Sequence, residues 1–206
     1  MKSNSTLTPS FICERLAGYQ RRSIGKSPLT KSAVLVPIVK RENGLELLFT
    51  KRSETVEHHK GQISFPGGAT DATDLSPADT ALRETFEEIG LERSAISIIG
   101  VMDDLQTPSG FVVTPVVGLI EHLPPLYINA EEVAQIIFIP LKKFFDDSLR
   151  HSEIRERDGV KIEVFTYEVW KEPVWGATAF FVKQLISLLK DVRCRKMTPS
   201  SLSTLF

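Results

Sequence analysis

The sequence predicts one α/β (α+β) domain, a sandwich in which a mixed β-sheet lies between helices. The 206 residues are 42% hydrophobic and 25% charged, which is typical of one soluble globular domain. Segments with strand composition outnumber helical segments, and several are joined by hairpin-like turns. One helix, over residues 77–89, has well-defined ends in the middle of the chain. A sheet with helices on its faces buries such a set of elements.

The first 32 residues precede the predicted core. Apolar residues recur at helical spacing after Ser10 and predict a short helix; they are Phe11, Ile12, Leu16 and Tyr19. A basic, serine-containing connector follows over residues 21–32. We expect the domain proper to extend over residues 33–190, and the basic, Ser/Thr-rich residues 191–206 to form a flexible tail.

Two strands are predicted at the start of the domain, over residues 33–40 and 45–52. The Asn43-Gly44 pair between them favours a hairpin, because both residues tolerate positive φ. A brief strand over residues 63–65 then runs into Pro66, Gly67 and Gly68. Proline removes a backbone donor and the two glycines allow close approach to a ligand, so we expect a functional loop there.

The helix over residues 77–89 has the strongest local signals in the chain. Ser76 is suited to cap it, with Asp79 as the second member of a capping pair. Pro77 suits the first helical position, and Gly90 suits the position after the last turn.

This helix carries an apolar stripe and an acidic cluster. At about 100° per residue, the stripe consists of Ala78, Ala81, Leu82, Thr85, Phe86 and Ile89. Glu84, Glu87 and Glu88 gather roughly opposite the stripe, and Arg83 is the one helix cation placed to compensate them. Such a cluster suits Mg²⁺, which takes oxygen ligands and is often completed by phosphate oxygens. The alternative is a solvated acidic helix face.

The remaining elements are mostly strands. We expect them over residues 96–105, 111–121, 133–139 and 160–169, with a short helix after Pro140 and a longer one over residues 176–192. The net charge of −1 gives no electrostatic footprint for a nucleic acid or a membrane surface. No apolar run is long enough to cross a bilayer and the N-terminus lacks a secretory signal pattern, so we expect a cytoplasmic protein.

Residues 68–91, read together, resemble a Nudix box. The match is strong over Arg83-Glu84-Thr85-Phe86-Glu87-Glu88-Ile89-Gly90-Leu91. Two departures lie upstream, because Asp74 stands where the box has glutamate and one extra residue separates it from Arg83. The resemblance implies a Nudix-type α/β/α sandwich and a metal site on the helix.

Other segments resemble the coenzyme A pyrophosphatase branch of the Nudix hydrolases. They cover residues 48–53, 61–68, 103–105, 107–111, 113–118 and 175–179. In this pattern Phe49 replaces a leucine, and Glu57 replaces an arginine. The resemblance implies Mg²⁺-dependent hydrolysis, with Mn²⁺ as a substitute, of coenzyme A or acyl-CoA to 3′,5′-ADP and 4′-phosphopantetheine or its derivative.

The resemblance also implies roles for individual residues. Glu84 and Glu88, one helical turn apart, are the first candidates for metal ligands, with Glu87 and the Gly68 carbonyl as further ligands. Nudix relatives draw the general base either from the box or from a loop elsewhere, so the candidates are Glu87, Glu131 and Glu132; we favour Glu87, with Glu132 as the second candidate.

Substrate phosphates are expected near the loop that precedes the helix. Arg52 and Lys60 flank this loop as cationic donors, and Gly67 and Gly68 allow close approach of the backbone. Three aromatic side chains could line a channel for a pantetheine arm or belong to the core; they are Phe65, Phe111 and Trp175.

Two other functions stay open. The same chemistry could act on another nucleoside diphosphate derivative, such as ADP-ribose, a dinucleotide or a nucleotide-sugar, and Glu57 keeps this alternative open. A non-catalytic Nudix ligand sensor is a different class of protein, but it predicts the loss of glutamates that this chain retains. Relatives of this branch are often dimers, so a homodimer is possible.

Overall fold

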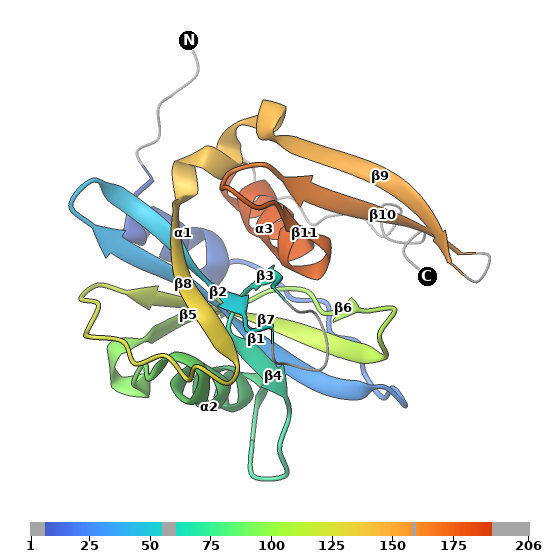
Figure 1. Ribbon diagram of the computed structural model, residues 1–206, viewed down its shortest axis with the longest axis horizontal. Coiled ribbons are helices and arrows are strands. Elements are labelled where there is room, and N and C mark those ends of the chain that lie inside the picture. Colours follow the sequence, from blue (N-terminus) through green and yellow to red (C-terminus); the bar gives the residue numbers. More distant parts are fainter. Residues whose placement is uncertain (1–6, 55–60, 158–159, 191–206) are drawn as a thin grey trace.

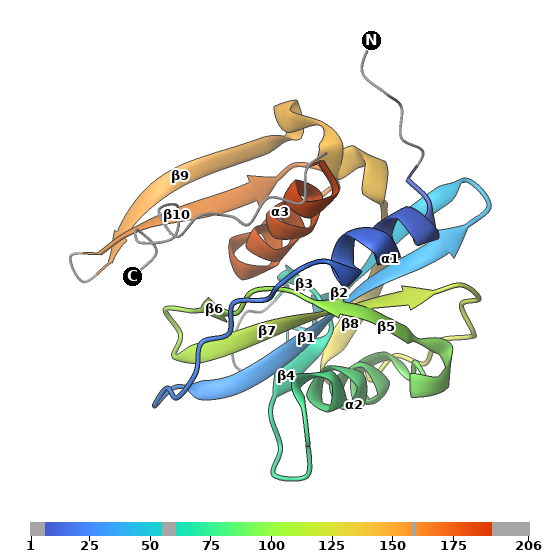
Figure 2. The same cartoon turned by 180° about the vertical axis from the view of Figure 1, so that it is seen from behind.

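The computed structural model describes residues 7–54, 61–157 and 160–190. A mixed sheet of eight strands forms the centre of the molecule (Figure 1). Helix α2 (Pro77–Ile89) covers one face, and helices α1 (Pro9–Ala17) and α3 (Gly176–Lys190) lie on the other (Figure 2). The predicted fold class, a mixed sheet between helices, is confirmed.

The central sheet has the strand order β3-β2-β1-β7-β5, and three strands pair beside this path. Its members are β1 (Thr30–Arg41), β2 (Gly44–Arg52), β3 (Ile63–Ser64), β4 (Gly67–Ala69), β5 (Ser97–Val101), β6 (Leu105–Gln106), β7 (Phe111–Ile120) and β8 (Val133–Pro140). Strands β1 and β7 are parallel, and the other pairs are antiparallel. The predicted hairpin is present, with Arg41 opposite Gly44 and a positive φ of 122° at Gly44.

Alternation along β1 divides the core between the two faces of the sheet. Val36 and Ile38 belong to the cluster that contains residues of α1 and α3. Leu35 and Val39 belong to the cluster that contains residues of α2. Successive strand residues point to opposite faces, so a strand that is apolar on both faces joins the two layers.

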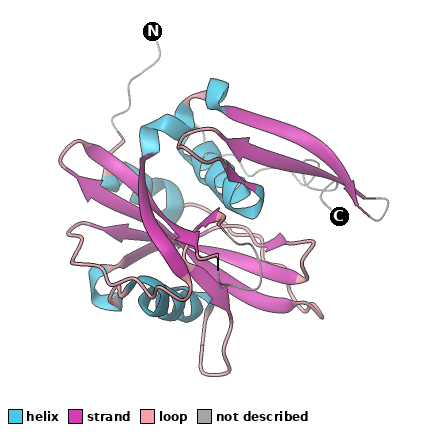
Figure 3. Ribbon diagram, in the orientation of Figure 1, coloured by secondary structure: helices cyan, strands magenta, loops and turns pink. Residues whose placement is uncertain are grey.

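A second sheet lies beside α3 (Figure 3). It consists of β9 (Arg150–Arg157), β10 (Val160–Tyr167) and β11 (Val174–Trp175). The described residues also form the 3₁₀ turns η1 (Arg93–Ala95), η2 (Leu141–Phe145) and η3 (Asp147–Leu149). We did not predict β9, whose sequence RHSEIRER is largely charged. Residues 151–156 are exposed, so no apolar alternation marks this edge strand.

Two expectations about local structure are wrong. The segment after Pro66 is strand β4 rather than a loop, because Gly67 and Gly68 pair with β1. The single strand expected over residues 96–105 is divided into β5 and β6, both of which pair with β7.

The N-terminal helix is present and contributes to the core. Thr8 caps it through a hydrogen bond from the Phe11 amide at 3.2 Å. Ile12 and Leu16 are buried in the same cluster as α3. No helix among the described residues is long and apolar enough to cross a membrane.

Candidate active site

Local capping fixes the helix that carries the glutamates. The Ser76 Oγ accepts a hydrogen bond from the Asp79 amide at 3.3 Å and donates one to the Asp79 carboxylate at 2.7 Å. The helix ends at Gly90, whose φ of 66° is left-handed. This conformation favours glycine, and a Cβ at Gly90 would also lie close to the Tyr127 Cβ, at 3.1 Å. The predicted bounds of this helix, 77–89, are confirmed.

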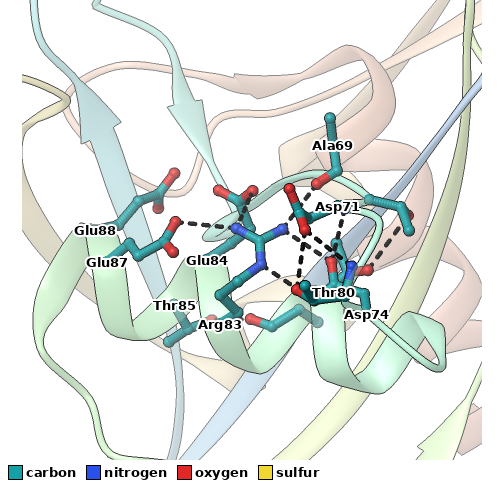
Figure 4. A network of polar contacts seen from close by, with 12 residues as sticks. Ala69, Asp71, Asp74, Thr80, Arg83, Glu84, Thr85, Glu87 and Glu88 are labelled. Atoms are coloured by element: carbon teal, nitrogen blue, oxygen red, sulfur yellow. Dashed lines mark hydrogen bonds and ion pairs between the residues drawn. The ribbon is translucent and has the colours of Figure 1, made fainter.

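Arg83 is the hub of the polar network (Figure 4). Its Nη1 donates to Glu84 at 2.9 Å and to Glu87 at 3.0 Å. Its Nη2 donates to the Ala69 carbonyl and to Asp74, both at 2.9 Å, and its Nε donates to Asp74 at 3.1 Å. The arginine therefore ties the acidic helix face to the preceding loop.

Asp74 is an arginine partner in this structure. Its side chain is 4% exposed, and its Oδ2 also accepts the Asp71 amide at 2.9 Å. The hydrogen bonds from Arg83 lower the pKa of Asp74 to about 2. A carboxylate that is fully used by a guanidinium and a backbone amide is poorly placed to serve as a metal ligand. The sequence marked Asp74 only as a departure from the box, so this role was missed.

Glu84 packs directly over strand β4. A Cβ added at Gly68 would collide with both carboxylate oxygens of Glu84, so a larger residue there would displace the Glu84 side chain from its present position. Burial raises the pKa of the Glu84 carboxyl, and Arg83 opposes that change. The predicted pair of Gly68 and Glu84 is therefore brought together.

Glu88 is buried, at 2% exposed, although the helical wheel placed it opposite the apolar stripe. Burial raises the pKa of its carboxyl to about 8, and Glu132 and Glu84 add to the rise. Arg52 and the Gly67 amide oppose it; the Arg52 Nη1 lies 4.0 Å from the Glu88 Oε1. The buried Oε2 has no hydrogen-bond partner.

Phe86 is the opposite case. It was placed on the apolar stripe but is 49% exposed. Strand β4 and the segment before β8 cover the Glu88 side of the helix, which explains why Glu88 is buried, whereas Phe86 lines a surface cavity. The Tyr127 amide bonds to the Ile89 carbonyl, and the Asn129 amide bonds to the Glu88 carbonyl, both at 2.9 Å.

This covering segment brings Glu132 to the cluster. The Asn129 Nδ2 donates to Glu132 at 3.4 Å, and Glu132 is close enough to raise the pKa of both Glu84 and Glu88. Asn129 is thus a positioning residue that the sequence did not reveal, because its partners are 40 or more positions away in the chain or lie in an irregular segment.

The remaining predicted substrate contacts have different positions. Arg52 faces Glu88, whereas Lys60 and Glu57 lie outside the described residues. Phe65 is 3% exposed and stacks on Phe49 at 4.7 Å, so it belongs to the core and cannot line a channel. Trp175 is 37% exposed, with the Arg155 guanidinium 5.9 Å from its ring.

The donor set fits a hard divalent cation. Glu84, Glu87, Glu88 and Glu132 offer only carboxylate oxygens, and one buried oxygen of Glu88 has no partner. Burial makes the Glu88 carboxyl costly to ionise, and a bound cation would favour its ionised form. Among the described residues, no three such groups already converge as a ready-made metal site. Arg83 bonds to Glu84 Oε1 and to Glu87 Oε2, and each carboxylate has a second oxygen that can bind a cation.

A cavity of about 330 Å³ opens elsewhere, on the outer side of α2. Asp74, Leu75, Phe86 and Arg93 are among its lining residues, and none of the three helix glutamates is. The charged pairs in it are closed, since Arg93 bonds to Asp79 at 2.7 Å and Arg83 bonds to Asp74. We therefore place the candidate active site at the glutamates and not in this cavity.

Comparisons with known proteins give consistent matches. A family model described as NUDIX domain matches residues 29–157. Proteins named "Uncharacterized Nudix hydrolase NudL" from Yersinia pestis (strain Pestoides F) and Yersinia pseudotuberculosis serotype O:1b (strain IP 31758) are 38% identical over 155 residues, which cover 75% of this chain and 77% of each relative.

Two solved structures are similar at lower identity. A Nudix hydrolase from M. smegmatis, RenU, is 20% identical with a TM-score of 0.48, covering 57% of this chain and 74% of that one. The NUDIX domain of Shewanella oneidensis NrtR, complexed with ADP ribose, is 20% identical with a TM-score of 0.47, covering 68% and 87%.

Proposed function

The chain belongs to the Nudix family, and we propose that it is a Mg²⁺-dependent pyrophosphatase of coenzyme A and its derivatives. The products are 3′,5′-ADP and 4′-phosphopantetheine or its acylated or oxidised form. The observation that carries the catalytic part is the buried, unpartnered oxygen of Glu88 among Glu84, Glu87 and Glu132. The choice of coenzyme A rests on the sequence segments that resemble the coenzyme A pyrophosphatase branch.

Four groups would hold the metal. They are the carboxylates of Glu84, Glu87 and Glu88 and the carbonyl of Gly68. Mg²⁺ supplies charge stabilisation for the pyrophosphate oxygens and lowers the pKa of a bound water. Arg52 is the cation paired with Glu88 and is proposed to bind the substrate phosphates, whereas the space beside Gly67 is filled by β1 and the space beside Gly68 by Glu84.

A carboxylate must remove the proton of the attacking water. We assign this role first to Glu87, which is half-exposed and oriented by Arg83. Glu132 is the second candidate, because it lies near Glu84 and Glu88 and the hydrogen bond that it accepts from Asn129 is long, at 3.4 Å. Comparing kcat against pH for Glu87→Gln and Glu132→Gln distinguishes them, since only loss of the base removes the acidic limb.

A substrate panel tests the proposed function. Purified protein is incubated with CoA, acyl-CoA, ADP-ribose and NADH in the presence of Mg²⁺, and products are resolved by mass. We expect 3′,5′-ADP and the phosphopantetheine product, and no turnover when EDTA removes the metal. Preference for ADP-ribose or NADH would replace the CoA assignment by another nucleoside diphosphate derivative. Binding without turnover of any compound would favour a sensor.

The setting of the enzyme follows from the same proposal. We expect small-molecule substrates, with no nucleic acid or membrane partner, in the cytoplasm. A homodimer stays a prediction, which sedimentation of the purified protein would test.

A further inference from the structure

The backbone of Arg52 is fixed at the end of β2. Its amide bonds to the Gln62 carbonyl at 3.0 Å, and the next amide, of Ser53, bonds to the Glu132 carbonyl at 2.8 Å. The pairing with β8 shifts register between Lys51 and Arg52. A bulge of this kind changes the direction of a side chain, and here the Arg52 guanidinium faces Glu88 across the candidate site.

The guanidinium itself is held loosely. Among the described residues, its ion pair is with Glu88 at 4.0 Å, beyond hydrogen-bond distance, and its buried Nε has no hydrogen-bond partner. Arg83, by contrast, makes five hydrogen bonds of 2.9 to 3.1 Å within the same site. Arg52 is therefore a movable cation on a fixed backbone.

Glu88 is the group that Arg52 and a divalent cation would share. Its Oε1 faces Arg52, and its Oε2 is buried without a partner. A divalent ion on this carboxylate would place two like charges close together in a poorly solvated site, which is unfavourable unless the guanidinium moves away. An arginine that leaves Glu88 needs another anion, and its planar donors match phosphate oxygens.

We propose that Arg52 is the resident counter-ion of Glu88 in the metal-free protein, that a divalent cation displaces it, and that the released guanidinium binds the phosphate oxygens of the substrate. This inference rests on the proposed role of Glu88 as a metal ligand. It makes Arg52 the link between cation and anion binding, so each ligand favours the other.

Titration with Mn²⁺ in the absence of any phosphate tests the competition. Arg52→Met and Arg52→Gln should lower the Kd for Mn²⁺ by about fivefold or more, because the competitor is gone. The matched control is Lys51→Met, whose ammonium pairs with Glu172 at 2.6 Å and which precedes Arg52 on the strand. It should change the Kd by less than about twofold. Unchanged or weaker Mn²⁺ binding by both Arg52 variants, or equal tightening in the control, would overturn the proposal.

Titration with inorganic pyrophosphate in EDTA tests the release. Glu88→Gln should lower the Kd for pyrophosphate by about fivefold or more, because Arg52 is freed without a metal. Glu87→Gln is the matched control, since its carboxylate is held by Arg83 instead. The gain should be absent from the double variant Arg52→Met/Glu88→Gln. Equal gains in Glu87→Gln and Glu88→Gln, or a gain that persists in the double variant, would contradict the proposal.

These titrations use no turnover and no coenzyme A. Rejection of coenzyme A as the substrate would therefore leave the role of Arg52 standing. Failure of the titrations would leave the proposed reaction standing.

Discussion

The burial of Glu88 opposes the charge that its proposed role as a metal ligand requires. The residue is almost fully buried. Replacing it with glutamine keeps the shape and removes the charge, so Glu88→Gln should lower kcat by about a hundredfold or more, on the order of 3 kcal/mol in the barrier. Steady-state kinetics at saturating Mg²⁺ measure this. A loss below about threefold would reject Glu88 as a metal ligand.

The same residue predicts how stability depends on pH. The pKa of Glu88 is raised from 4.5 to about 8 in the folded protein, because burial disfavours the charged form. The contribution of this carboxyl to the free energy of unfolding is therefore fully present below its pKa in the unfolded protein, and it is lost as the pH rises to its pKa in the folded protein. In EDTA, the free energy of unfolding should fall by a few kcal/mol between about pH 5 and about pH 8.5 through this group.

Glu88→Gln is the control for that pH dependence. The variant lacks the titrating group, so its urea unfolding curves should shift less over the same pH range, and it should be at least as stable as the natural protein at the alkaline end. Parallel pH profiles for the two proteins would contradict the assigned cause.

At the scale of elements, helix α2 was predictable and its surroundings were not. Ser76, Pro77 and Gly90 lie within one residue of the helix ends, so the signals are local. The burial of Glu88 depends on β4 and on a segment around Asn129, whose pairing with the helix is nonlocal. The periodicity of apolar residues indicates only the helix face that packs on the sheet. The contact of α2 with β4 and with the segment around Asn129 arises from the tertiary fold and leaves no such pattern.

The same distinction separates the contacts that the sequence indicated from those that it did not. The three glutamates and Gly68 come from a motif with fixed spacing, and the structure brings Gly68 and Glu84 into contact. The partnership of Asp74 with Arg83 depends on how the loop folds back, and no spacing rule in the sequence contains it.

The hydrogen bonds between Asp74 and Arg83 join the loop before α2 to the helix, so we predict that a change at Asp74 affects both. Asp74→Asn replaces a carboxylate that accepts two hydrogen bonds from Arg83, so it should destabilise the protein by about 2 kcal/mol at neutral pH, as expected for hydrogen bonds to a charged group. It should also lower kcat, because Arg83 orients Glu84 and Glu87. Urea unfolding and steady-state kinetics measure the two effects.

Asp71 provides a matched control in the same loop. It is exposed and its carboxylate bonds to Thr73, not to Arg83. Asp71→Asn should therefore leave kcat nearly unchanged. Equal effects of the two substitutions on kcat would show that loop stability, rather than the hold on Arg83, is what matters.

At the scale of the whole molecule, hydrogen bonds attach the N-terminal segment to the sheet and to α3. The Arg15 guanidinium bonds to the Leu188 carbonyl near the end of α3, at 2.8 and 3.0 Å. Asp103, which precedes β6, accepts the Arg22 amide at 2.7 Å, and its own amide bonds to Gln184 of α3 at 2.9 Å. The Asp103-Asp104 pair, which the sequence singled out as part of a family pattern, thus joins the connector to the sheet and α3.

Asp104 is a buried carboxylate of this junction that accepts three hydrogen bonds. Its side chain is 3% exposed, and its Oδ1 accepts hydrogen bonds from Arg21 and from Thr114, both at 2.7 Å. Its Oδ2 accepts the Ile24 amide at 2.8 Å. In Asp104→Asn, the amide group must face one of these donors whichever way it is turned, and Arg21 loses its charged partner. We expect a loss of about 2 to 3 kcal/mol in the free energy of unfolding, measured with urea.

The exposed ion pair between Arg93 and Asp79 is the control for this prediction. The Arg93 side chain is 68% exposed, and its distance to Asp79, 2.7 Å, equals that between Arg21 and Asp104. Solvent screens the exposed pair, so Arg93→Gln should hardly move the urea midpoint. If the two substitutions shifted the midpoint equally, burial of the junction would not be the source of its strength. If Asp104→Asn left the midpoint unchanged, the N-terminal segment would not depend on this junction for its attachment.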